Sequence, residues 1–161
     1  MIVIVMGVVG VGKTTVGKLL AAQLGWEFAD ADDFHPSSNV EKIRNGIALT
    51  DADRAPWLET LRTAIDRWIA ESRNVVLACS ALKSSYRERL QAGPAVRFVY
   101  LKGSKALIGE RLRSRQGHFA TDSILVSQLA DLEEPASALM VEVTDSPQQI
   151  VSHIRAGLGL G

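Results

Sequence analysis

The sequence is poor in the features that mark secreted, membrane-spanning and nucleic-acid-binding proteins. Its single cysteine, Cys79, excludes an internal disulfide and fits a reducing compartment. No apolar run approaches the length of a membrane span, so we expect a cytoplasmic protein without membrane contact. Eighteen acidic and eighteen basic side chains cancel to zero net charge, which argues against the basic surface that nucleic acids require. A small-molecule partner is therefore expected.

Short β-branched runs alternate with helical patterns along the 161 residues. Strands are predicted at residues 2–6, 27–29, 74–79, 96–101 and 139–143. This alternation is typical of a three-layer α/β fold, in which helices flank a five-stranded parallel sheet. The length suits one compact core, so we treat residues 1–161 as a single domain.

The roughly 44 residues between the second and third predicted strands exceed what one crossover helix needs. We predict a helical insert at residues 37–72 that covers a substrate. It should contain a short helix from Ser37 or Ser38 to Arg44, capped by those serines and ended by Asn45 and Gly46. A longer helix should follow at about residues 54–71. Trp57 and Trp68 on the longer helix are predicted to pack in the core, as is Cys79 in its apolar strand.

A glycine-rich segment separates the first predicted strand from a helix-periodic stretch. Its glycines let backbone N–H groups turn toward one anion, its lysine supplies a mobile cation, and its threonine offers a hydroxyl to Mg²⁺. The helix that follows directs its free N–H groups at the same phosphates. The sequence therefore predicts a nucleoside triphosphate site made by Gly7, Val8, Val9, Gly10, Val11, Gly12, Lys13, Thr14 and Thr15.

Acidic residues follow the second predicted strand, at the edge where open parallel sheets bind ligands. Asp30 and Asp32 are therefore expected to face the phosphates. One could hold the water shell of Mg²⁺ while the other orients or deprotonates the attacking hydroxyl. The alternative is that these aspartates only satisfy backbone donors of a turn. Sequence order does not say which of the two is the base, although we assign that role to Asp32 and the metal to Thr14 and Asp30.

Ser80 stands at the end of the third predicted strand, directly after Cys79, where many phosphate-loop ATPases carry an aspartate. A motor protein or a switch GTPase becomes a weaker interpretation. A small-molecule kinase becomes a stronger one.

Five segments together carry a more specific resemblance. They are the phosphate loop; residues 30–36 with Asn39, Lys42 and Gly46; residues 49–58; residues 79–83 through Arg87; and residues 101–103 leading to Arg111, 115–119 and 132–135. On these the chain resembles the gluconate kinase (gluconokinase) family, a shikimate-kinase-like group of phosphate-loop kinases. Val9 and Val11 depart from the family, which more often has serine there, but the backbone makes the cradle.

The resemblance implies ATP-dependent phosphorylation of D-gluconate to 6-phosphogluconate, with Mg²⁺ as cofactor and usually in a homodimer. It also assigns His35 to the substrate site. Gluconate carries a carboxylate and several hydroxyls, so its site should offer cations and hydrogen-bonding groups. Arg54, Lys83, Arg87 and His118 are the candidates. Nearby Asp51 and Asp53 have two interpretations, helix capping or substrate contact.

Arg111 and Arg115 lie four residues apart on the helix after the fourth predicted strand, so both can reach one side. In related kinases such arginines belong to a lid, here residues 112–124, that meets the phosphates and excludes water. We therefore assign Lys13, Asp32, Arg111 and Arg115 to catalysis, and Arg111 also to the nucleotide. Two rival functions stay open: a similar kinase for another acceptor such as shikimate, and a nucleotide-dependent switch module.

Overall fold

The computed structural model describes residues 1–115 and 119–161, and the side chains of residues 1–113 and 124–161. Five parallel strands form one sheet in the order β2-β3-β1-β4-β5. The strands are β1 (Ile2–Met6), β2 (Glu27–Asp30), β3 (Val75–Ala78), β4 (Val96–Lys102) and β5 (Leu139–Glu142). The predicted α/β class, five-stranded parallel sheet and strand positions are confirmed, with ends that differ by at most one residue.

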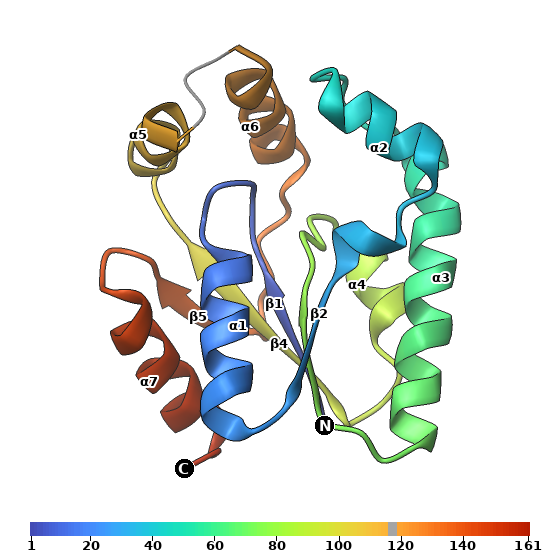
Figure 1. Ribbon diagram of the computed structural model, residues 1–161, viewed down its shortest axis with the longest axis vertical. Coiled ribbons are helices and arrows are strands. Elements are labelled where there is room, and N and C mark those ends of the chain that lie inside the picture. The colour runs from blue at the N-terminus through green and yellow to red at the C-terminus, as the bar shows by residue number, and fades with distance from the viewer. Residues whose placement is uncertain (116–118) are drawn as a thin grey trace.

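Helices cover both faces of the sheet (Figure 1). On one face lie α1 (Lys13–Leu24) and α7 (Pro147–Leu158), which pack against alternate residues of β1 such as Val3 and Val5. On the other lie α3 (Asp51–Ala70) and α4 (Ser84–Leu90), which pack against Ile2 and Ile4. Because β1 is buried on both faces, all of its residues are apolar.

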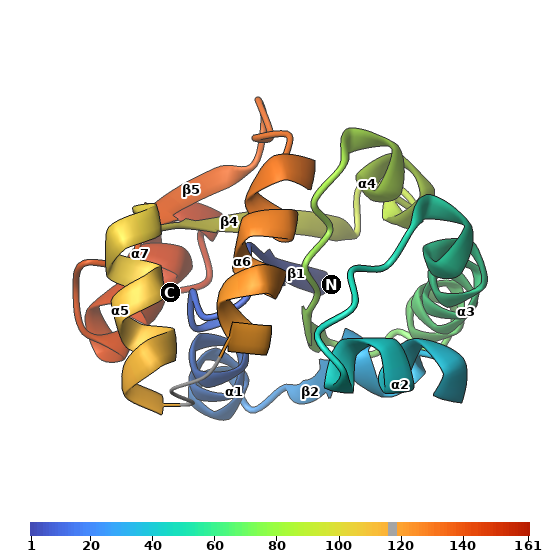
Figure 2. The same ribbon diagram turned by 90° about the horizontal axis from the view of Figure 1, so that it is seen from above.

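Three more helices lie beyond the carboxyl ends of the strands. They are α2 (Ser37–Arg44), α5 (Lys105–Arg115) and α6 (Phe119–Asp131). Seen from above, α6 lies across the strand ends between α5 and the α2–α3 side of the molecule (Figure 2). Among the residues that the structure describes, no helix is long and apolar enough to cross a membrane.

The insert between β2 and β3 is helical as predicted, but its caps differ. The short helix α2 has Pro36 as its N-cap, and no side chain caps it, so the predicted serine cap is wrong. The longer helix α3 begins at Asp51, three residues earlier than predicted. Thr50 starts it with a capping box, in which its hydroxyl accepts from the Asp53 backbone N–H and the Asp53 carboxylate accepts from the Thr50 N–H. The capping interpretation of Asp53 is thus the one the geometry supports.

The predicted core residues are buried. Trp57 and Trp68 are 2% and 6% exposed and share one hydrophobic cluster with Cys79. Burial raises the pKa of the Cys79 thiol to about 12, so this cysteine is inert as a nucleophile.

Candidate active site

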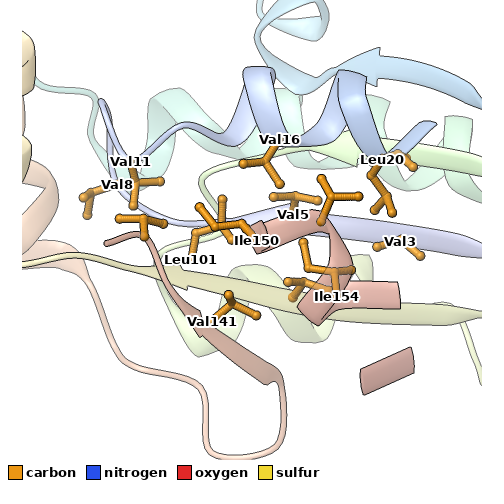
Figure 3. Packing of buried hydrophobic residues seen from close by; sticks show 14 of the residues in the cluster. Val3, Val5, Val8, Val11, Val16, Leu20, Leu101, Val141, Ile150 and Ile154 are labelled. Carbon is orange, nitrogen blue, oxygen red and sulfur yellow. The ribbon is translucent and has the colours of Figure 1, made fainter. Parts of the chain in front are cut away.

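The phosphate loop joins the end of β1 to the start of α1. Val8 and Val11 point their side chains into the cluster beneath α1 and are almost fully buried (Figure 3). Gly10 and Gly12 have φ of +81° and +103°, a region that favours glycine. Buried valines thus anchor the loop from below, and its backbone is left to make the cradle.

Lysine and threonine at the end of the loop face the acidic segment as predicted. The Thr14 hydroxyl lies 3.0 Å from Oδ2 of Asp30, and Lys13 Nζ donates to the Val8 carbonyl over 3.1 Å. Burial lowers the pKa of the Lys13 ammonium, and the negative charge of Asp32 opposes this shift. These contacts bring together residues of β1–α1 and of the β2 end, which the sheet order separates by one strand.

A short 3₁₀ helix, Ala31–Phe34, follows β2 and sets the two aspartates apart. Asp30 caps it, because its Oδ1 accepts from the Asp32 backbone N–H at 3.0 Å. Desolvation raises the pKa of the Asp32 carboxyl, and the neighbouring Asp30 charge raises it further. Asp30 is therefore held by backbone and Thr14, whereas the pKa of Asp32 is shifted toward that of a useful proton acceptor.

A cavity of about 230 Å³, which we call the Asp32 cavity, opens beside the loop. Its polar lining includes Lys13, Thr14, Asp30, Asp32, His35, Arg54 and Gln128. The insert and the segment just before it both contribute, since Arg54 is in the first turn of α3 and His35 precedes α2. The cavity thus brings most of the predicted catalytic, metal and substrate residues to one place.

Among the described side chains Arg54 is the one charged residue that is buried, with 7% of its surface exposed. Its Nη1 donates to the Tyr86 hydroxyl at 3.0 Å and to Oδ2 of Asp131 at 3.1 Å. These partners come from α4 and α6, so the arginine ties three helices together at the cavity wall. Neither Tyr86 nor Asp131 was predicted to be a site residue.

Lys83 and Arg87 lie outside the Asp32 cavity. Lys83 pairs with the Asp51 carboxylate at 2.9 Å, and the Tyr86 hydroxyl donates to the same carboxylate. Arg87 donates to the backbone carbonyls of Ala81, Leu82 and Glu133. Arg87 thus braces the loop after β3 and the segment that follows α6, whereas Lys83 ties the loop after β3 to the first turn of α3. Direct substrate contact by these two cations stays a prediction.

Arg111 lies in a second cavity, of about 470 Å³, on the other side of the phosphate loop. Its Nη2 donates to the Val143 carbonyl at 2.8 Å, and Pro147 and Asp145 line the same space. This Arg111 cavity and the Asp32 cavity share Gly10, Gly12 and Thr15. The two predicted roles of Arg111, in catalysis and in nucleotide contact, stay predictions.

The predicted lid at 112–124 is described in part. Its residues 112–115 form the end of α5 and its residues 119–124 the start of α6. His118 lies outside the described residues, and the side chain of Arg115 is likewise outside them, so their predicted roles stay predictions.

Gln128 is a site residue that the sequence analysis missed. Its Oε1 accepts from the Val9 backbone N–H at 2.7 Å, which joins α6 to the phosphate loop. The two residues are 119 positions apart, so no local spacing signals the contact. Asn39, buried beneath His35, was also given no role, although it lies in a family-like segment.

Comparisons with known proteins show the family of this chain. A family model described as Shikimate kinase matches residues 9–157. A gluconokinase of Gluconobacter oxydans (strain 621H) is 48% identical over 133 residues, covering 82% of this chain and 75% of the relative. A probable gluconokinase of Xenopus tropicalis is 42% identical over 96% of this chain and 91% of its own length.

Solved structures give the same result. The crystal structure of a gluconokinase from Sinorhizobium meliloti 1021 superposes with a TM-score of 0.87 at 41% identity, covering 98% of this chain and 91% of that one. The predicted resemblance is confirmed: this chain belongs to the gluconokinase family, within the shikimate-kinase-like phosphate-loop kinases.

Proposed function

We propose that this protein transfers the γ-phosphoryl group of ATP to the terminal hydroxyl of D-gluconate, giving 6-phospho-D-gluconate and ADP. The observation that carries the proposal is the convergence of Lys13, Asp32 and Arg54 on one cavity beside the phosphate loop. A cation near the phosphates, a carboxylate with a raised pKa and a second cation for an acid substrate are what this transfer needs. Relatives named gluconokinase favour gluconate over shikimate as the acceptor.

The two cavities divide the substrates. The adenine and ribose of ATP would occupy the Arg111 cavity, and its phosphates would cross the shared glycines toward Lys13. Gluconate would occupy the Asp32 cavity, with its carboxylate near Arg54. The insert at 37–72 then serves as the substrate-binding part of a single domain at 1–161, and residues 112–124 as its lid.

In the reaction, the gluconate 6-hydroxyl oxygen forms the new bond to the γ-phosphorus while the bond from that phosphorus to the β–γ bridging oxygen breaks. Asp32 orients the hydroxyl and takes its proton. Lys13 and the loop N–H groups stabilise the charge on the phosphoryl oxygens. Most of the catalysis is thus positioning and electrostatics.

Mg²⁺ fits the residues present. The Thr14 hydroxyl and the Asp30 carboxylate supply hard oxygen ligands 3.0 Å apart, and Mg²⁺ is usually held by one or two such groups together with substrate phosphates. Within the described residues no cluster of three or more His, Cys, Asp or Glu side chains is gathered for a metal, which suits an ion that arrives with ATP. When bound, Mg²⁺ would neutralise phosphate charge.

A homodimer and a cytoplasmic location complete the proposal. The family resemblance supports the homodimer, and the single buried cysteine supports the location.

The test of the function is identification of the product. Incubation with Mg-ATP and D-gluconate should give a phosphate monoester on the primary hydroxyl, observed by ³¹P NMR as a triplet split by two methylene protons. A phosphate on another position, or inorganic phosphate alone, would contradict the proposal.

A further inference from the structure

Asn39 is a buried amide whose orientation the structure fixes. The side chain is 2% exposed, and its Nδ2 lies 2.7 Å from the backbone carbonyl oxygen of Asp53. A carbonyl oxygen only accepts hydrogen bonds, so the amide atom facing it must be the nitrogen. The reversed amide would bring two oxygens into repulsive contact at that distance.

The same nitrogen determines which nitrogen of His35 carries a proton. Asn39 Nδ2 lies 3.2 Å from His35 Nδ1. A planar amide nitrogen carries two hydrogens and accepts none, so one N–H serves Asp53 and the other serves His35. His35 Nδ1 must then be the acceptor, and the proton of the neutral ring is on Nε2.

Packing holds the ring in this orientation. Trp57 stacks on His35 with ring centroids 4.3 Å apart and planes 12° from parallel. The indole is itself fixed, because Trp57 Nε1 donates to the Ala31 carbonyl at 2.7 Å. With one ring face on Trp57 and Nδ1 on Asn39, the Nε2 edge is the polar part of His35 left for the cavity that it lines.

We infer that Asn39 is a positioning residue that holds His35 as the Nε2–H tautomer, a neutral hydrogen-bond donor to a hydroxyl or carboxylate oxygen of a polyhydroxy acid. The donor role rests on the proposed function, whereas the tautomer does not. A ring held this way has no free lone pair on either nitrogen. His35 therefore cannot act as the general base, and proton acceptance falls to a carboxylate.

The electrostatics of the cavity agree with a neutral ring. Burial lowers the pKa of His35 to about 4, and the nearby Arg54 cation contributes to the same shift. Arg54 and His35 then present a charged and an uncharged donor to one acceptor molecule. Such a pair discriminates against analogues that lack the matching oxygen, because the donors would be left without partners.

The tautomer can be read directly by long-range ¹H–¹⁵N correlation NMR of the full-length protein at neutral pH, without ligand. Protonated and unprotonated ring nitrogens give well-separated signals, and the chain has three histidines. His35→Gln identifies the His35 signals by their loss. We expect an unprotonated Nδ1 and a protonated Nε2. A protonated Nδ1 would overturn the inference whatever the enzyme's activity.

Variants of Asn39 test its positioning role. Asn39→Asp should move the proton to Nδ1, because a carboxylate accepts where the amide donated. Asn39→Ala should give signals averaged between the two tautomers, and it serves if the aspartate variant fails to fold. The matched control, Asn45→Asp, changes an exposed asparagine at the end of the same helix. Unchanged His35 signals in both Asn39 variants would overturn the role of Asn39.

Kinetics test the donor role separately. Glutamine places an N–H near the position of Nε2, whereas leucine places none, so kcat/KM for D-gluconate should fall about tenfold further in His35→Leu than in His35→Gln. Equal losses would overturn the donor role. Absence of gluconate turnover in the unmodified protein would instead refute the proposed function and leave the NMR result standing.

Discussion

Oε1 of Gln128 lies 2.7 Å from the backbone nitrogen of Val9, so helix α6 is hydrogen-bonded directly to the phosphate loop. Gln128 also lines the Asp32 cavity, which places it beside the reacting groups. This hydrogen bond therefore couples the position of the phosphate loop to that of α6, which forms one side of the cavity.

Replacing Gln128 with methionine should lower kcat/KM about tenfold, because the Val9 N–H loses its acceptor and α6 loses its attachment to the loop. The free energy of unfolding should fall by only about 1 kcal/mol, the net worth of one hydrogen bond. Steady-state kinetics and urea unfolding measure the two effects. The matched control is Gln148→Met, at an exposed position on α7. Equal activity in the two variants would contradict a role for Gln128.

Lys13→Ala should reduce turnover by at least about 100-fold, since the charge nearest the phosphates is lost. Stability should change little, because burial already lowers the pKa of this ammonium and makes its charge costly to keep. Lys18→Ala, on the exposed side of the same helix, is the control. An unchanged rate in Lys13→Ala would contradict the assignment of Lys13 to the active site.

Arg54→Met should destabilise the fold by about 2 kcal/mol or more. The change leaves the Asp131 carboxylate and the Tyr86 hydroxyl without the cation that now binds both. Thermal or urea unfolding measures the loss, and Arg62→Met, which removes an exposed i,i+4 pair on the same helix, is the control. Equal losses in the two variants would show that the buried network contributes no more to stability than the exposed pair does.

The pH dependence of kcat/KM should show an acid limb from Asp32. Its carboxylate must be ionised to accept the proton, so the rate falls as pH decreases through a pKa held above the ordinary aspartate value of about 3.9. Asp32→Asn should abolish turnover, while Asp33→Asn on the same 3₁₀ helix keeps it. A larger loss in the Asp33 variant would reassign the base.

His35 should make stability fall as pH decreases from 6.5 to about 4. In this window the unfolded chain takes up a proton on His35 that the folded protein does not bind, so acid favours unfolding. His35→Gln lacks that group and should lose less stability over the same range. Urea unfolding at several pH values compares the two proteins, and parallel curves would contradict the lowered pKa.

The layers and strands of the fold could be predicted because each rests on a local pattern. β1 is apolar on both faces, and the glycines, lysine and threonine that follow it have a fixed spacing. The first residue of α3 was harder to predict, because a helix could begin either after Thr50 or near Arg54. Local sequence does not decide between such caps.

The candidate site was predictable where residues follow a strand end and less so where they arrive from distant helices. Asp30 ends β2, Asp32 follows it, and both line the cavity, as expected. Lys83 and Arg87 also follow a strand, yet they bind Asp51 and backbone carbonyls instead. Charge and spacing alone do not distinguish a cation that meets substrate from one that braces a loop.

The most direct test is a coupled assay of ADP formation with Mg-ATP and, in parallel, D-gluconate, shikimate or no acceptor. We predict ADP formation with D-gluconate and only background rates in the other two reactions. Turnover that is absent with gluconate, faster with shikimate or independent of any acceptor would contradict the assignment of D-gluconate to the Asp32 cavity.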